Sequence, residues 1–198
     1  MFSRSCTGRR DHDSVFRRDD DGAGSGHTRV AWQDVILRQD SESSFSELRE
    51  SPVVLLGAFP PAWTLRLTHQ MRYSLALDAE RHLIYIKDAK DPASHRWSWA
   101  TDQPKEHQGD AGQPPLEDFA LISRIWNSDT GRPIIVIGGL YTYGTEAAGE
   151  FLNDPQMMQA IAREAALKNP RSNVQIVLGT TVTDGTAGPP HVIAVSSE

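Results

Sequence analysis

Glycine and threonine residues gather at the end of one apolar run, in the stretch PIIVIGGLYTYGTEAAGEFL over residues 133–152. The run ends in Gly138-Gly139, which predicts a buried strand and a turn, and a helix is expected after Gly144-Thr145. The first turn of a helix carries unbonded backbone N–H groups and the positive end of the helix dipole. The chemistry that this spacing favours is therefore the binding of a phosphate or another small anion.

A second apolar run, PVVLLGAF, also has a glycine at its end, Gly57. If the two strands are parallel neighbours, their carboxyl ends meet at the edge where open α/β sheets bind ligands. Glycines there let a ligand approach the backbone, threonines donate hydrogen bonds, and arginine balances a phosphate charge. Rings on which a base could stack are those of Phe59, Trp63, Tyr141 and Tyr143. The predicted ligand-binding residues are Gly57, Trp63, Arg66, Gly138, Gly139, Thr142, Gly144, Thr145, Glu146 and Glu150.

Catalytic patterns are weaker than this binding pattern. Glu146 and Glu150 are four residues apart on one helix face, which suits general acid–base catalysis but also suits a solvated surface. The sequence contains no H-E-x-x-H, no G-x-S-x-G and no G-x-x-x-x-G-K-[ST] motif. Cys6 is the single cysteine, which excludes an internal disulfide and a cysteine-based zinc site. No catalytic residue is assigned, and neither a metal nor a cofactor is expected.

The elements that must position these residues alternate in kind along the chain. Strands are expected at Val35–Arg38, over 53–57, 82–88 and 95–100, in a hairpin over 119–139 that turns near Gly131, and over 173–185 and 189–197. Helices are expected near Ser44, over 62–76 with Leu65, Met71 and Leu75 inward, from Thr145 to Asn153, and over 155–169 after an Asp154 N-cap. The predicted fold class is α/β: a Rossmann-like three-layer sandwich with a mixed, mostly buried sheet of about seven or eight strands.

Length and composition limit the organisation of the chain. With 198 residues it can form one domain and a tail, and we expect a disordered tail over 1–29 and a single α/β domain over 30–198. A net charge of −6 argues against a nucleic-acid-binding surface. No apolar run is long enough to span a membrane, and the first residues lack the apolar core of a secretory signal. We therefore expect a soluble, cytoplasmic protein.

Five stretches cover roughly three quarters of the chain in a fixed order: SFSELRESPVVLLGAF, WTLRLTHQMRYSLA, EDFALISRIWNSDTGRPIIVIGGL, YGTEAAGEFL and NVQIVLGTTVTDGTAGPPHVIAV. They resemble an uncharacterised α/β domain family of soil bacteria. That resemblance implies a domain that often follows a DNA-binding, repeat or membrane-anchored region. It also implies that this chain is either a stand-alone version or a shortened one. No activity or ligand comes with the resemblance.

A more distant likeness concerns the glycine turns. The strand, Gly138-Gly139 and Gly144-Thr145 look like the P-G-G-x-G-T-x-x-E signature of SLOG and lysine-decarboxylase-like nucleotide-binding families. This likeness implies that those four residues hold phosphate, with Glu146 or Glu150 near a ribose. The four residues LYTY separate the glycine elements where the signature has fewer, and its proline is absent.

Three functions are compatible with these observations. The favoured one is a small-molecule-binding or sensory domain for a nucleotide-like or other phosphate-containing anion. The second is a nucleotide N-glycosidase or phosphohydrolase in which Glu146 or Glu150 acts as the base. The third is a protein–protein interaction module without a ligand, which would form a homo-oligomer or bind a partner protein.

Overall fold

The computed structural model describes residues 52–57, 67–101, 116–128, 130–164, 169 and 171–198. Every described residue belongs to one compact unit of the chain. The tail predicted over 1–29, the strand predicted at Val35–Arg38 and the helix predicted near Ser44 lie outside the described residues.

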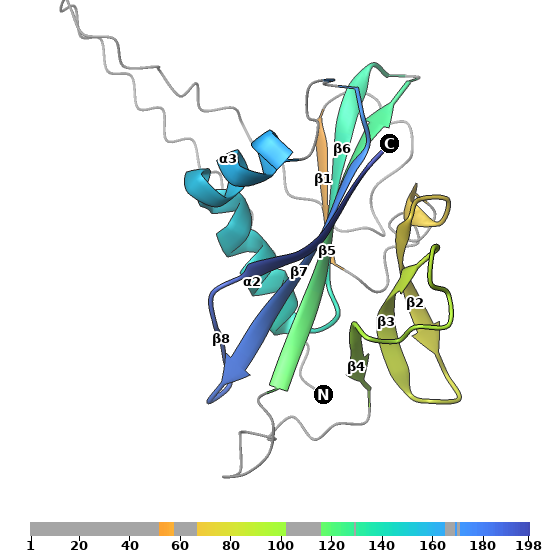
Figure 1. Ribbon diagram of the computed structural model, residues 1–198, viewed down its shortest axis with the longest axis vertical. Coiled ribbons are helices and arrows are strands. Elements are labelled where there is room, and N and C mark those ends of the chain that lie inside the picture. The colour runs from red at the N-terminus through yellow and green to blue at the C-terminus, as the bar shows by residue number, and fades with distance from the viewer. Residues whose placement is uncertain (1–51, 58–66, 102–115, 129, 165–168, 170) are drawn as a thin grey trace, which may run out of the picture. The chain divides into compact units, whose positions relative to one another are not determined.

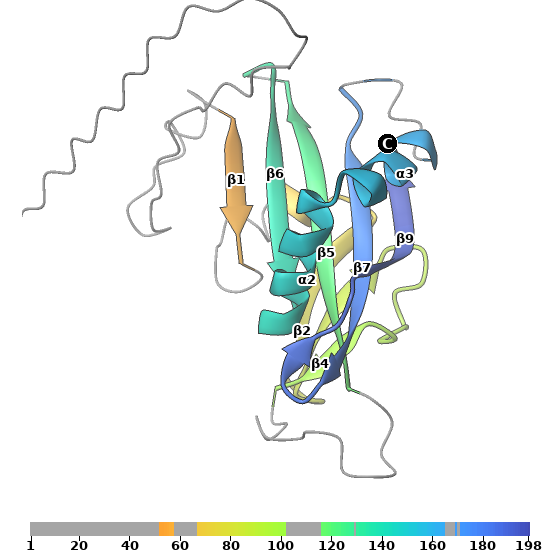
Figure 2. The ribbon, with the colours of Figure 1, turned by 90° about the vertical axis from the view of Figure 1, so that its left-hand side faces the viewer.

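The larger of two sheets has six strands of mixed direction. They are β1 (Val53–Leu56), β6 (Arg132–Gly139), β5 (Leu116–Asn127), β7 (Val174–Thr183), β8 (Thr186–Ala187) and β9 (His191–Ser197), and both β8 and β9 pair with β7. β1 is parallel to β6, whereas every other pair is antiparallel. Figure 2 shows β1, β6, β5, β7 and β9 side by side in this order.

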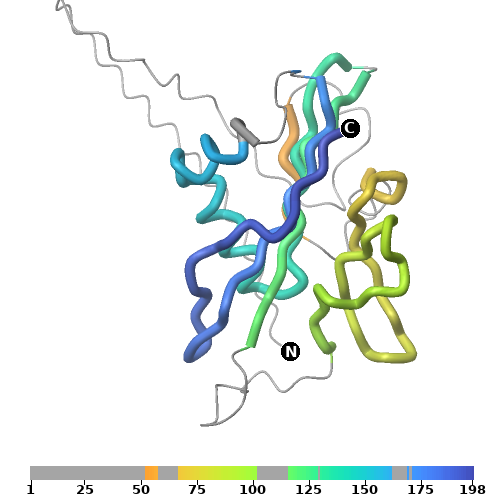
Figure 3. The backbone as a smooth tube through the Cα atoms, viewed as in Figure 1, coloured from red at the N-terminus to blue at the C-terminus, as the bar shows by residue number. Residues whose placement is uncertain are grey.

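Several local predictions are confirmed in this sheet. β5 and β6 form the expected hairpin, whose two strands Figure 3 shows side by side, and Gly131 between them has a φ of +66°. β7 and β9 form the expected antiparallel pair. The helix α3 (Pro155–Glu164) begins after an Asp154 cap, because the Asp154 carboxylate accepts the N–H groups of Gln156 and Met157 at 2.7 and 3.2 Å. Turn and cap residues therefore fixed these boundaries locally.

The smaller sheet is a three-stranded antiparallel sheet of β2 (Tyr73–Asp78), β3 (Leu83–Asp88) and β4 (Ser98–Ala100). The predicted strands over 82–88 and 95–100 correspond to β3 and β4. Residues 73–76, however, were expected to continue a helix, and they form β2 instead.

Two apolar cores lie on opposite faces of the larger sheet. One core joins that sheet to β2, β3 and β4, and its buried members are Tyr73, Leu75, Ile86, Trp97, Trp99, Phe119, Leu121, Leu140 and Val177. The other core joins the sheet to α2 (Thr142–Asn153) and α3, through Ala120, Ile122, Ile137, Ala148, Phe151, Ile161, Val174, Ile176 and Leu178. The six-stranded sheet therefore lies between the two helices and the smaller sheet, as Figure 1 shows.

A buried glutamine ties the two sheets together. Gln175 of β7 is 1% exposed, and its side chain bonds both backbone groups of Tyr73 at the start of β2. The Tyr73 N–H donates to Gln175 Oε1 at 2.8 Å, while Gln175 Nε2 donates to the Tyr73 carbonyl at 2.7 Å and to Ser123 Oγ at 3.1 Å. The Gln175 amide thus supplies the two hydrogen bonds that a neighbouring strand would otherwise make with the Tyr73 backbone.

The predicted fold class, an α/β Rossmann-like three-layer sandwich with one mixed, mostly buried sheet, is wrong. The described residues are mostly strands, in two sheets, and their two α-helices lie on the same face of the larger sheet. The error has a physical cause at residues 71–75. Met71 and Leu75 are four apart, which suits a helix, but Tyr73 between them is also buried, and burial at every second residue is the pattern of a strand.

β1 also differs from its prediction. The run VVLL was expected to be buried on both faces, yet Val54 is 58% and Leu56 is 63% exposed. β1 lies at the end of the strand order, with β6 as its partner among the described strands. An edge strand keeps one face open where no helix covers it, which the apolar run by itself does not indicate.

Candidate functional site

The two glycine-ended strands are neighbours in the sheet, which is the condition on which the predicted site depended. β1 and β6 are parallel, with Leu56 opposite Ile137. The N–H of Gly57, at a φ of +115°, donates to the Ile137 carbonyl at 2.8 Å, so Gly57 follows β1 beside the carboxyl end of β6. α2 begins at Thr142, three residues before the expected Thr145. The strand ends and the helix start therefore lie together at one sheet edge.

A side chain from β5 occupies the backbone amides at this junction. Asp118 is fully buried, and its carboxylate accepts three backbone N–H groups: Gly144 to Oδ2 at 2.6 Å, and Phe119 and Tyr141 to Oδ1 at 2.7 and 3.2 Å. Gly144 lies in the first turn of α2, where an external anion was expected to bind. The chain supplies its own anion at these amides.

The charge of Asp118 is set by opposing effects. Burial raises the pKa of this carboxyl from 3.8 to about 6, while the hydrogen bonds from Gly144, Phe119 and Tyr141 lower it and so limit the rise. At neutral pH most of the carboxyl groups are ionised, because the pH then exceeds the pKa. A negative charge consequently faces the positive end of the α2 dipole.

The glycines of the junction are close-packed against backbone. A Cβ on Gly139 would lie 2.2 Å from the Thr145 nitrogen, and one on Gly144 would lie 2.3 Å from the Phe119 carbonyl oxygen. The Thr145 hydroxyl accepts the Gly139 N–H at 3.2 Å and donates to the Tyr141 carbonyl at 3.3 Å. These glycines and Thr145 therefore bring β5, β6 and α2 into contact, a role that the sequence pattern does not separate from ligand binding.

Replacing Gly139 with alanine is expected to lower the free energy of unfolding by about 2 kcal/mol, since the new methyl group overlaps a backbone nitrogen. Urea denaturation measures the loss. Gly149→Ala is the matched control, because a Cβ there meets no atom within 4 Å and alanine favours the helix by up to about 1 kcal/mol. Equal stability of the two variants would contradict the close packing of Gly139.

The two tyrosines of the junction are half-buried and pack against a ring of the smaller sheet. The Tyr141 ring stacks on Trp99 of β4, with ring centroids 4.9 Å apart and planes at 3°. Tyr143 lies tilted against both, at 6.3 Å from Trp99 and 5.7 Å from Tyr141. Trp99 is buried, so one ring of the smaller sheet takes the position that a nucleobase was predicted to take.

The remaining predicted site residues are placed as follows. Gly138 is buried in β6, opposite Leu121 of β5. Thr142, Glu146 and Glu150 are exposed on α2. Trp63, Arg66 and the predicted stacking residue Phe59 lie outside the described residues. The catalytic role considered for the two glutamates stays a prediction.

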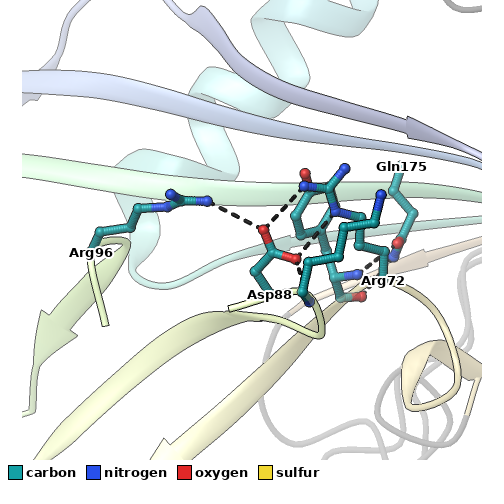
Figure 4. A network of polar contacts seen from close by, with 6 residues as sticks. Arg72, Asp88, Arg96 and Gln175 are labelled. Atoms are coloured by element: carbon teal, nitrogen blue, oxygen red, sulfur yellow. Dashed lines mark hydrogen bonds and ion pairs between the residues drawn. The ribbon is translucent and has the colours of Figure 1, made fainter. Parts of the chain in front are cut away.

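A second polar cluster, which the sequence analysis missed, lies at one end of the smaller sheet (Figure 4). Asp88 ends β3, and its carboxylate is shared by two arginines. Arg72 binds it with two groups, Nε to Oδ1 at 3.1 Å and Nη2 to Oδ2 at 3.2 Å, and Arg96 Nη2 binds Oδ2 at 3.2 Å. The Lys90 N–H also donates to Oδ1, at 3.0 Å. We call Arg72, Asp88 and Arg96 the arginine pair cluster.

Burial and charge differ across the arginine pair cluster. The Asp88 side chain is 4% exposed, whereas the side chains of Arg72 and Arg96 are 25% and 50% exposed. Hydrogen bonding by Arg72 holds the pKa of Asp88 below its ordinary value, and the same contact raises the pKa of Arg72. The two arginine side chains therefore flank one buried carboxylate, and they are the part of the cluster that is exposed to solvent.

Each arginine of the cluster also lies over a ring. The guanidinium carbon of Arg72 is 4.7 Å from the centre of the Tyr73 ring, and that of Arg96 is 4.1 Å from the Trp97 ring. Both rings are buried core members and contact each other edge to face. The only local signal of this arrangement in the sequence is that each arginine immediately precedes an aromatic residue.

Comparisons with protein families, with curated proteins and with solved structures found no match to this chain. The suspected relation to a soil-bacterial domain family, and the more distant one to nucleotide-binding families, stay predictions. Over the described ranges, no helix is both long and apolar enough to cross a membrane. The same residues contain no group of three or more histidine, cysteine, aspartate or glutamate side chains placed to hold a metal ion.

Proposed function

We propose that the protein binds a small anionic molecule, of the phosphate or carboxylate class, at the arginine pair cluster. The observation that carries this proposal is the half-exposed Arg96 guanidinium, held beside Arg72 on one buried carboxylate. The ligand class is the one that the glycine turns led us to expect, but the location differs.

The number of donors supports this location. A guanidinium has five N–H groups in a fixed fork that suits phosphate and carboxylate oxygens. Arg96 directs its Nη2 to Asp88, and half of its side chain faces solvent. Because both arginines bind the same Oδ2 atom, their Nη2 groups lie within reach of a single anion.

The fixed positions of the two guanidinium groups also support an anion-binding site at the arginine pair cluster. Asp88 and the Tyr73 and Trp97 rings hold the two guanidinium groups before any ligand arrives. A positioned side chain loses less conformational entropy on binding than a mobile one. By contrast, the amides of the β6–α2 junction are bonded to Asp118, so an anion there would have to displace a buried carboxylate.

Isothermal titration calorimetry with inorganic phosphate and with pyrophosphate tests this proposal. Arg96→Ala is expected to weaken binding at least tenfold, about 1.4 kcal/mol, because it removes the more exposed of the two cations. Binding by wild type is expected to weaken as salt is added, since the site is partly exposed. Arg72 is unsuitable for this test, because its removal would leave Asp88 with less compensation for its burial.

Arg81→Ala is the matched control. Arg81 is also exposed and paired with an aspartate, Asp78 at 2.7 Å, but it belongs to the β2–β3 turn. The Arg81 variant is expected to bind as wild type does. The proposal fails if neither probe binds wild type at millimolar concentration, or if the two variants lose affinity equally.

A further inference from the structure

The peptide unit between Arg72 and Tyr73 is held from both sides. Its carbonyl, that of Arg72, accepts the Ala89 N–H at 2.8 Å, and its N–H, that of Tyr73, donates to Gln175 Oε1 at 2.8 Å. Ala89 follows β3 of the smaller sheet, whereas Gln175 lies in β7 of the larger one. The backbone that carries the Arg72 side chain is therefore fixed by both sheets.

The Gln175 amide has one orientation in this contact. Its Nε2 donates to the Tyr73 carbonyl at 2.7 Å and to Ser123 Oγ at 3.1 Å, while its Oε1 accepts the Tyr73 N–H. A backbone N–H only donates and a carbonyl only accepts, so a flipped amide would place like groups together. Gln175 is 1% exposed and Ser123 is fully buried, so bulk water does not replace a hydrogen bond lost there.

The two arginines of the arginine pair cluster differ in what holds their backbone. The Arg96 N–H donates to Ser94 Oγ at 3.4 Å. The carbonyl of the next residue, Trp97, accepts the Ile86 N–H at 2.9 Å. Both contacts lie within the smaller sheet and its β3–β4 connection, whereas the larger sheet bonds the peptide unit beside Arg72. The relative position of the two guanidinium groups therefore depends on a contact with the larger sheet.

We propose that Gln175 is a positioning residue for the anion site, an inference that rests on the proposed function. Gln175 is buried and acts through Tyr73, whose ring lies under the Arg72 guanidinium at 4.7 Å (Figure 4). Without the glutamine, the peptide unit before Tyr73 is held from one side only. Arg72 then loses its fixed position beside Arg96, and anion binding has to supply the conformational entropy of ordering it.

The coupling between the two places works in both directions. A change at one site that alters affinity at another is matched by an equal effect in the reverse direction. An anion that bridges Arg72 and Arg96 consequently stabilises the bonds between Tyr73 and Gln175. Anion binding at the arginine pair cluster is in this way linked to the packing of the smaller sheet on the larger one.

Nuclear magnetic resonance of the ligand-free protein tests the positioning role directly. The Arg72 Nε–H, which donates to Asp88 Oδ1, reports where the guanidinium lies. Gln175→Leu is expected to shift or broaden this resonance. Ser123→Ala is the matched control, because it removes one bond of the Gln175 amide and leaves both bonds to Tyr73, and it is expected to leave the resonance in place. Circular dichroism shows that both variants are folded.

Isothermal titration calorimetry with pyrophosphate measures the effect on binding. Gln175→Leu is expected to weaken binding at least about fivefold, the lower end of typical coupling between sites, whereas Ser123→Ala keeps the affinity of wild type. If pyrophosphate does not bind wild type, the proposed function fails, and the Arg72 resonance still decides the positioning role. An unmoved Arg72 resonance in Gln175→Leu, or equal affinity of Gln175→Leu and wild type, overturns the inference.

Hydrogen exchange in wild type tests the same coupling without a substitution. Saturating pyrophosphate is expected to slow exchange of the Tyr73 amide, which is bonded to Gln175, more than exchange of the Phe151 amide. Phe151 lies in α2, in the core on the opposite face of the larger sheet. Equal slowing at the two amides overturns the inference, because a general stabilisation of the fold would then account for both.

Discussion

Replacing Gln175 with leucine is expected to lower the free energy of unfolding by about 3 kcal/mol. Leucine has a similar size, but it cannot bond the Tyr73 N–H and carbonyl or Ser123 Oγ, all of which lie within 3.1 Å of the glutamine amide. A buried polar group that loses its partner costs about 1–3 kcal/mol. Chemical denaturation followed by tryptophan fluorescence measures the loss, because Trp97 and Trp99 belong to the core between the sheets.

Gln156→Leu is the control for this prediction. Gln156 is exposed near the start of α3, where a surface substitution changes stability by less than about 0.5 kcal/mol. If Gln175→Leu is as stable as this control, the contact between Gln175 and Tyr73 does not hold the smaller sheet to the larger one. A stability loss together with unchanged tryptophan emission in the native state would show that the sheets still pack.

Local sequence signals predicted the parts of the fold that depend on neighbouring residues. Gly131 indicated the β5–β6 turn, and Asp154 with Pro155 indicated the start of α3, because turn and cap geometry involve few residues. These predictions needed no knowledge of distant parts of the chain.

Contacts between distant residues could not be predicted in this way. Gln175 meets Tyr73 across 102 residues, and Asp118 meets Gly144 across 26. No local pattern shows that β2 packs against the larger sheet, or that an aspartate in β5 accepts hydrogen bonds from the amides at the start of α2. A nest of amides looks the same in a sequence whether its anion is a ligand or a side chain.

The stability of wild type relative to Asp118→Asn is expected to fall by about 2 kcal/mol as the pH rises from 4 to 7.5. The pKa of Asp118 is raised in the folded protein from 3.8 to about 6, chiefly by burial. A raised folded pKa means that the folded state binds the proton more tightly, so its stabilising contribution is complete below 3.8 and is lost as the pH passes about 6. The difference between those pKa values sets the size of the effect.

The comparison with the variant is needed because other carboxylates act in the opposite direction. The pKa values of Asp88 and Asp78 are lowered, first by the Arg72 side chain and by the Arg81 backbone N–H respectively. Their contributions are present at neutral pH and are lost as the pH falls. These terms are common to wild type and Asp118→Asn, so they cancel in the difference between the two unfolding curves.

Asp184→Asn provides the control for this pH series. Asp184 is exposed in a turn at a φ of +50°, a conformation that asparagine also adopts. Its variant is expected to follow the pH dependence of wild type. A constant difference between wild type and Asp118→Asn from pH 4 to 7.5 would mean that the three amides balance the burial of the carboxylate completely. The ionised Asp118 carboxylate would then be as stable at the junction as it is in water. An external anion would have to displace a carboxylate that is bound more tightly than the raised pKa implies.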